Sequence, residues 1–294
     1  MKTQSIVTIL DKPKHRQVAF ERAMKIQDAM GAHVDLLGFC WHPMAEAKQS
    51  FDNHQRAAIK REIMRAEKEW QRQLVQAEAY RARNITLETL WSANIADWVV
   101  NRLRQQPSDL LVKTAHRSQS FMHAPLDWAL LERSPVPLLL ATNKSQNPSG
   151  RVIATIDLQN QDATHMRLNR KVLDAAAHFA KLYNGQLHCI CVIEFSEILR
   201  DLDIVDARKH KREVLTQQKE TLTSLVAPYG IAKSRLHAPT GKVGQRVNQL
   251  SHKLNADLLV VGTHAKRLKE RFRLGNSAER ILTKATCDVL AVPP

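Results

Sequence analysis

The chain repeats itself, and this repeat constrains its fold more than any other feature. SIVTILD (Ser5 to Asp11) returns as RVIATID (Arg151 to Asp157), and DLLVKTAH (Asp109 to His116) returns as DLLVVGTH (Asp257 to His264). In both copies a short helical pattern and an apolar strand follow. Self-similarity of this kind identifies a tandem duplication.

The duplication predicts two similar domains, one over residues 1–142 and the other over residues 151–294. The stretch between them, NKSQNPSG, is polar, rich in turn residues and without an apolar period, which is typical of a linker.

Short apolar runs alternate with helical patterns in each half, which indicates parallel strands joined by right-handed crossovers. The predicted fold class is therefore α/β, with two tandem, open, Rossmann-like parallel sheets. The strands are expected at 6–10, 33–39, 85–90, 110–114 and 138–141, and at 152–156, 187–193, 235–237, 258–261 and 289–292.

The longest helical pattern lies within Gln49 to Ala82 and carries one apolar stripe at steps of three and four residues. This spacing predicts an amphipathic helix packed on a sheet. The stripe consists of Ile59, Ile63, Ala66, Trp70, Leu74 and Ala77.

Composition points to a globular protein. The 294 residues are 44% apolar and 25% charged, and no apolar run approaches the roughly 20 residues that a membrane span requires. We expect a soluble, cytoplasmic protein without integral membrane association.

The four cysteines lie in or beside apolar, strand-like runs and show no paired spacing, so buried apolar roles are expected.

Basic residues outnumber acidic ones by 44 to 29, a net charge of +15, which directs attention to anionic partners. Charge alone does not distinguish nucleotides, nucleic acid and acidic lipid. The run KRLKERFR at Lys266 to Arg273 is the densest basic stretch, yet no helix-turn-helix, zinc or RNA-binding signature accompanies it.

Ligands of open parallel sheets bind beyond the carboxyl ends of the strands. In the second half, Asp157, Val192 and Gly262 lie at or near such ends, and Gly275-Asn276-Ser277 opens a helix. Free amides at a helix start favour phosphate, a glycine permits close approach, and an aspartate accepts from ribose hydroxyls or a base amine. The same residues are also compatible with a turn and a helix cap, because Glu279 follows Asn276 at capping-box spacing.

At these residues the sequence resembles the universal stress proteins, and within them the tandem, E-type branch. The nucleotide motif of that family is Gly, two residues, Gly, nine residues, Gly and then Ser or Thr. Here it reads Gly262, two residues, Ala265, nine residues, Gly275, Asn276, Ser277. The resemblance covers the whole chain and implies two domains facing each other through their last strands as a pseudo-dimer, leaving further homodimerisation open.

The resemblance also implies an adenine nucleotide, ATP with magnesium, as the ligand of the second half. Ala265 stands where the family has its middle glycine and disfavours positive φ, so weak binding is expected. The first half departs further: Thr114 replaces the first glycine, Pro125 has no N–H to offer, and Asp127 is expected to repel phosphate. It is predicted to be a degenerate copy.

The function that these features predict is a stress-response protein that binds or regulates without catalysis. Paired catalytic carboxylates, a Walker loop and a Ser-His-Asp pattern are all absent from the sequence. Two alternatives stay open: a slow ATP hydrolase or nucleotide-using transferase on the same scaffold, and a nucleic-acid or acidic-lipid binder that uses the basic surface.

Overall fold

The structure, a computed structural model, describes residues 3–77, 84–115, 125–143, 149–159, 161–194, 207–263, 281 and 284–294. It divides into two compact units, Lys2–Ala141 and Thr142–Pro294, called the first and the second unit below. Ala265, Gly275, Asn276, Ser277 and the basic run at Lys266 to Arg273 lie outside the described residues.

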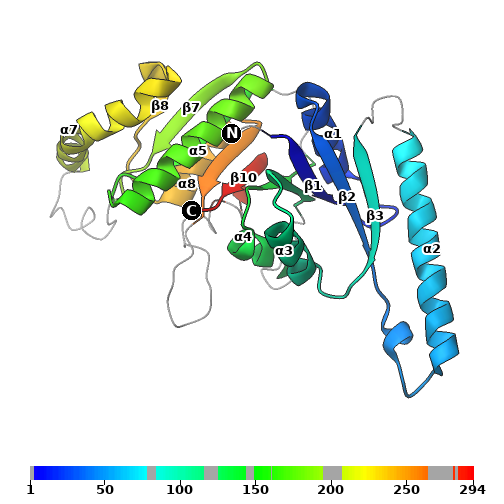
Figure 1. The fold of residues 1–294 in the computed structure, drawn as a ribbon. Helices are drawn as coiled ribbons and strands as arrows, with labels where there is room; N and C mark the ends of the chain where they lie inside the picture. Colours follow the sequence, from blue (N-terminus) through cyan, green and yellow to red (C-terminus); the bar gives the residue numbers. More distant parts are fainter. Residues whose placement is uncertain are drawn as a thin grey trace. The chain divides into compact units, whose positions relative to one another are not determined.

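The first unit is an α/β domain with a parallel sheet of order β3-β2-β1-β4-β5 (Figure 1). Its strands are β1 (Ser5–Ile9), β2 (His33–Cys40), β3 (Ile85–Trp91), β4 (Leu110–Thr114) and β5 (Leu138–Ala141). Its helices are α1 (Val18–Met30), α2 (Asn53–Ala77), α3 (Ile95–Gln105) and α4 (Pro125–Arg133), with a 3-10 turn η1 (Pro43–Glu46).

The second unit has the same topology, with a parallel sheet of order β10-β9-β6-β7-β8. Its strands are β6 (Arg151–Ile156), β7 (Gln186–Cys191), β8 (Leu236–His237), β9 (Leu258–Gly262) and β10 (Asp288–Val292). Its described helices include α5 (Ala163–Leu182), α7 (Ala207–Val226) and α8 (Val243–Lys253), and the 3-10 turns η2 (Ala227–Tyr229) and η3 (Lys233–Arg235) follow α7. In Figure 1, α5 lies on one side of this sheet and α8 on the other.

The predicted fold class is confirmed, and the ten predicted strands lie within two residues of the observed ones. Central strands such as β4 and β9 are buried almost throughout, because helices cover both faces of a parallel sheet and every side chain must then be apolar or paired. The predicted pairing of 138–141 with 289–292 stays a prediction.

Helix α2 corrects one expectation. Of its predicted apolar stripe, Ala66 and Ala77 are exposed and the other members are half-buried, whereas the buried residues of the helix are Glu67 and Gln71. The reason lies on the sheet, where Gly38 leaves room that a Cβ would fill: its ideal position is 1.5 Å from the Gln71 amide nitrogen.

The buried Gln71 side chain is satisfied by its neighbours. Its oxygen accepts from Thr89 Oγ1 at 2.6 Å, and its nitrogen donates to Glu67 Oε1 at 3.2 Å. Burial raises the pKa of the Glu67 carboxyl, although the Gln71 hydrogen bond and the charge of Lys12 oppose the rise. Helix α2 therefore packs through a polar network instead of a continuous apolar stripe.

All four cysteines are free and buried, as predicted. The structure places Cys40 at the end of β2, Cys189 and Cys191 in β7, and Cys287 just before β10. Among the described helices, none combines the length and apolar character that crossing a membrane would need.

Candidate functional site

The candidate site of the second unit lies at the carboxyl edge of its sheet, where strand order reverses between β6 and β9. Asp157 directly follows β6, Val192 directly follows β7, and Gly262 is the last residue of β9. Because β7, β6 and β9 are successive neighbours in a parallel sheet, their ends share one edge. The structure thus brings these three predicted residues to the edge at which open α/β sheets bind ligands.

A side-chain amide fixes the backbone of Asp157. Asn169 Oδ1 accepts from the Asp157 N–H at 3.0 Å, and Asn169 Nδ2 donates to the Asp157 carbonyl at 2.6 Å. The Asp157 side chain is exposed, and its Oδ1 accepts from the Gln159 N–H at 2.8 Å. With the backbone held and one carboxylate oxygen used locally, Oδ2 has no hydrogen-bond partner among the described residues and is available to a ligand donor.

Gly262 has a packing role that the sequence did not reveal. A Cβ at this position would lie 2.8 Å from Leu168 Cδ2 and 2.9 Å from Leu168 Cγ, so any side chain would displace Leu168 of α5. The glycine therefore lets α5 approach the end of β9 closely. This contact accounts for a glycine here whether or not a ligand binds.

The first unit closes the corresponding edge with its own side chains. Thr114, at the end of β4, donates a hydrogen bond from Oγ1 to Asp11 Oδ2, and the same oxygen accepts from the Ala19 N–H at 2.9 Å. Asp11 and Thr114 are each only 7% exposed. Gln17 binds the Asp11 backbone N–H and carbonyl at 3.0 and 3.2 Å, the role that Asn169 has in the second unit.

A buried ion pair lies next to this closed edge. Lys113 Nζ is 2.5 Å from Asp127 Oδ1, both side chains are almost completely buried, and Lys113 also donates to the Thr114 carbonyl at 2.8 Å. Our expectation that Asp127 repels phosphate is therefore wrong, because Lys113 neutralises its carboxylate. Among the described residues of the first edge, the Asp11 carboxylate is not open to a ligand because it is buried and hydrogen-bonded to Thr114, and α4 begins at Pro125.

A histidine pair in the second sheet was missed by sequence reasoning. His188 of β7 and His237 of β8 are stacked with ring centroids 5.4 Å apart, and His188 Nδ1 is 3.1 Å from His237 Nε2. Burial first, and then the charges of His237, Arg235 and Arg151, lower the pKa of His188 to about 4. Burial first, and then the charge of Lys253, also lower the pKa of His237. Forty-nine residues separate its members, so no local pattern could identify it.

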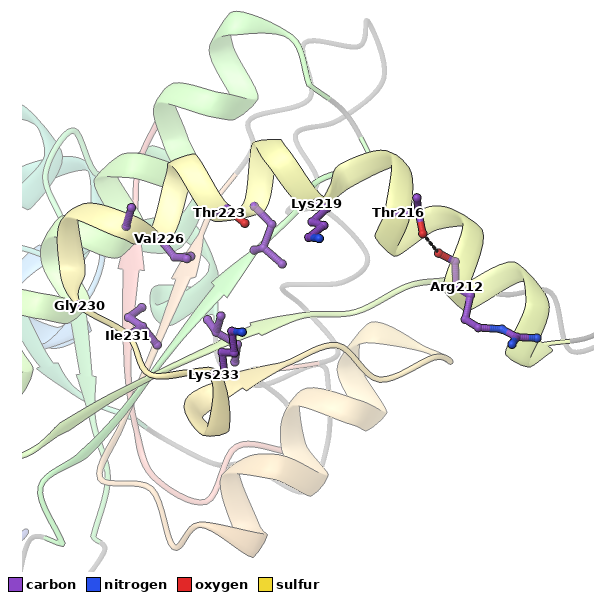
Figure 2. Close-up of a pocket in the computed structure, with 11 residues that line it drawn as sticks. Arg212, Thr216, Lys219, Thr223, Val226, Gly230, Ile231 and Lys233 are labelled. Atoms are coloured by element: carbon purple, nitrogen blue, oxygen red, sulfur yellow. Dashed lines mark hydrogen bonds between the residues drawn. The ribbon is translucent and has the colours of Figure 1, made fainter.

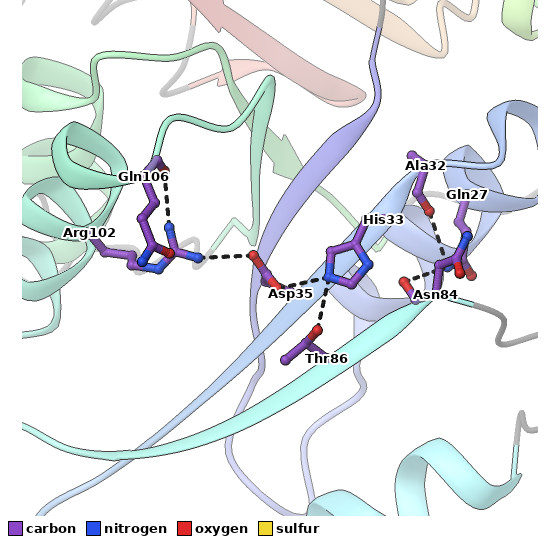
Figure 3. Close-up of polar contacts among 8 residues, drawn as sticks. All are labelled: Gln27, Ala32, His33, Asp35, Asn84, Thr86, Arg102 and Gln106. Atoms are coloured by element: carbon purple, nitrogen blue, oxygen red, sulfur yellow. Dashed lines mark hydrogen bonds and ion pairs between the residues drawn. The ribbon is translucent and has the colours of Figure 1, made fainter.

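A Thr-His-Asp group at the amino edge of the first sheet invites comparison with a catalytic triad (Figure 3). Thr86 Oγ1 is 2.9 Å and Asp35 Oδ1 3.1 Å from the same His33 atom, Nε2. A relay needs the hydroxyl on one ring nitrogen and the carboxylate on the other. Arg102 instead donates hydrogen bonds to Asp35 Oδ2 at 3.2 Å and to the Gln106 carbonyl at 3.0 Å. The group therefore links β2, β3 and α3 through polar contacts.

Comparison with known proteins agrees with this architecture. The model of the Universal stress protein family matches residues 165–293. Universal stress protein E of Escherichia coli is 21% identical over 299 residues, which cover 99% of this chain and 94% of that protein. A crystal structure of a putative universal stress protein from Pseudomonas aeruginosa superposes with a TM-score of 0.75 at 21% identity, covering 99% of this chain and 94% of that one.

A shorter relative is more similar in sequence. Universal stress protein A homolog 1 of Coxiella burnetii is 34% identical over 143 residues, which are 48% of this chain and 94% of that protein. Nearly the whole of that protein is therefore matched within about half of this chain. Together with the duplicated α/β topology and the full-length likeness to E-type proteins, this identity shows that the chain belongs to the universal stress protein family.

Proposed function

We propose that this protein is a stress-response binding module that holds at most one adenine nucleotide per chain, at the carboxyl edge of its second sheet, without catalysing a reaction. The difference between the two copies of this edge carries the proposal. The Asp157 carboxylate is exposed, whereas the Asp11 carboxylate is buried and bonded to the Thr114 hydroxyl. The Asp157 carboxylate of the second unit can therefore accept from a ligand, whereas the equivalent Asp11 carboxylate of the first unit is hydrogen-bonded within the protein.

The described residues fit the base and ribose end of such a ligand. Asp157 offers a carboxylate whose backbone is held by Asn169, and Val192 is an apolar residue, 8% exposed, at the end of the neighbouring strand. An acceptor beside an apolar surface suits a ribose hydroxyl or a base amine next to a flat ring.

The phosphate end depends on residues outside the described ones. We expect the amides that follow Gly275 and Asn276, and the hydroxyl of Ser277, to bind phosphate oxygens as a helix start does. Magnesium bound with the nucleotide would neutralise part of the phosphate charge. Ala265 in place of a glycine disfavours positive φ in the loop and is expected to make the binding weak.

Calorimetry of the full chain with ATP and magnesium tests this function. We expect no more than one site per chain, with binding abolished by Gly275→Trp and strengthened by Ala265→Gly. Asp157→Ala should weaken binding about tenfold or more, since hydrogen bonds to charged groups contribute roughly 1.5–3 kcal/mol.

The matched control is Asp11→Ala, which removes the equivalent carboxylate from the first unit and should leave nucleotide affinity unchanged. Far-ultraviolet circular dichroism of each variant verifies that it is folded. Two sites per chain, or a site that survives Gly275→Trp, would contradict the proposal. No binding by the wild-type chain would leave the stretch around Gly275 as a turn and a helix cap.

A further inference from the structure

A groove runs along α7 at the outer edge of the second sheet (Figure 2). One wall is α7 itself, and the other is the segment that follows it, through Ile231 and Lys233 to Leu236 of β8. Its volume is about 610 Å³. β8 is the outermost strand of this sheet and is only two residues long, and Leu236 of β8 is among the residues that line the groove.

The floor of the groove is apolar. Leu222, Ile231 and Leu236 are half-buried, and Val226 is 6% exposed, so solvent reaches a continuous apolar surface between the two walls. A row of apolar side chains in a groove is the usual receptor for the apolar face of an amphipathic helix. Arg212 to Val226 span about 21 Å of helix, which accommodates a partner helix of about four turns.

The rim of the groove is basic. Arg212, Lys219 and Lys233 line it, all three are exposed, and none of the described lining residues is acidic. Glu213 and Glu220 are on α7 but do not line the groove. In the described part of the chain, none of the three cations has a carboxylate within ion-pair distance.

The spacing of these cations discriminates between classes of ligand. Arg212 and Lys219 are two helical turns apart, about 10 Å, and Lys233 is on the opposite wall. In Figure 2 the three lie spread along the groove and not gathered at one end. A fatty acid has a single acidic headgroup and would engage one end, whereas a helix with acids on both sides of an apolar stripe meets all three.

We propose that this groove is a docking site for an acidic amphipathic helix of a partner protein. The apolar stripe of the helix would cover Leu222, Ile231 and Leu236, and its carboxylates would pair with the three cations at the rim. The site shares no residue with the nucleotide edge, so it stands independently of the proposed function.

Fluorescence anisotropy with a labelled synthetic peptide tests the proposal on the full chain. The probe is a fourteen-residue helix with leucines at i, i+3, i+4 and i+7 spacing and glutamates on both flanks. A scrambled peptide of the same composition is the first control. We expect the amphipathic peptide to bind, the scrambled one to bind at least tenfold more weakly, and added salt to weaken the binding.

Two variants locate the site. Lys219→Glu with Lys233→Glu should weaken peptide binding at least tenfold, and Leu222→Ser should weaken it several-fold. The matched control is Lys68→Glu, an exposed lysine on α2 of the first unit, combined with Lys253→Glu on α8 so that the change in net charge is equal. This control should bind within about twofold of wild type.

Four results would overturn the proposal. If the scrambled peptide bound as tightly as the amphipathic one, the binding would reflect nonspecific charge attraction. The same would follow if the control pair weakened peptide binding as much as Lys219→Glu with Lys233→Glu does. Binding of palmitate in the groove without binding of the peptide would assign the groove to a single-headgroup amphiphile. Failure of the amphipathic peptide to bind the folded wild-type chain would remove the docking site altogether.

Discussion

The hydroxyl of Thr114 donates a hydrogen bond to the carboxylate of Asp11, across 103 residues of sequence. Both groups are buried, and the same hydroxyl oxygen receives the Ala19 N–H at the start of α1. Thr114 therefore has the position in the first sheet that Gly262 has in the second. It hydrogen-bonds the Asp11 carboxylate, whereas the equivalent Asp157 carboxylate of the second unit is exposed. A threonine at this position and a buried Asp11 carboxylate thus belong to one arrangement.

Thr114→Ala is expected to destabilise the protein. The substitution leaves the Asp11 carboxylate and the Ala19 N–H without this partner, and an unsatisfied buried polar group costs about 1–3 kcal/mol. Urea unfolding followed by circular dichroism measures the loss. Thr114→Ser keeps the hydroxyl and should recover most of the stability; a Thr114→Ala variant as stable as wild type would show that the hydrogen bonds contribute nothing.

Gly262→Ala should destabilise the second unit through Leu168. The new methyl group would lie 2.8 Å from Leu168 Cδ2, and overpacking of a close-packed core costs about 1–3 kcal/mol. Leu168→Ala alone creates a cavity, but the double variant should be more stable than the sum of the two single effects predicts. Strictly additive losses in urea unfolding would show that the two residues do not compete for the same space.

Acidification should lower the free energy of unfolding because the pKa of His188 is lower in the folded protein than in the unfolded chain. Its pKa is about 4 in the folded protein and has the ordinary value of 6.5 when unfolded. Between pH 6.5 and pH 4 the unfolded chain binds a proton here that the folded chain does not, so the free energy of unfolding falls as pH falls. The loss reaches on the order of 3 kcal/mol at about pH 4, because each pKa unit corresponds to about 1.4 kcal/mol.

The comparison of His188→Gln with His252→Gln measures this contribution. His188→Gln removes one titrating group and should reduce the slope of unfolding free energy against pH between 6.5 and 4. His252 is exposed on α8, and His252→Gln should keep the wild-type slope. Identical slopes in all three proteins would exclude His188 as the source of the acid sensitivity.

The thiols should react slowly while the protein is folded. Burial raises the pKa of Cys189 to about 12 and, despite a backbone hydrogen bond, that of Cys191 to about 11. The thiolate is the reactive form, so at pH 8 both thiols are protonated as well as inaccessible. Labelling with a maleimide and peptide mass spectrometry should show at least tenfold faster modification in urea than in buffer. Rapid native labelling of Cys189 and Cys191 would show that β7 opens readily.

Sequence patterns alone were enough for the fold and for the strand ends at which the candidate site is predicted. The repeat of SIVTILD as RVIATID and of DLLVKTAH as DLLVVGTH predicted the duplicated topology, and alternation of apolar runs with helical patterns located the ten strands. These features are local, because the period of the backbone forces apolar side chains to recur where a face is buried. Strand ends follow from strand positions, so Asp157, Val192 and Gly262 were assigned to one edge correctly.

Tertiary contacts decided what the local patterns could not contain. Lys113 neutralises the Asp127 carboxylate, and α2 buries Gln71 because Gly38 of β2 leaves room for its side chain. The basic, apolar-floored groove is formed where α7 meets the segment that leads to β8. Each of these features depends on a contact between residues that are far apart in the sequence. The hydrogen bonding and packing at that contact determine whether a charged group is paired within the protein or free to bind a ligand.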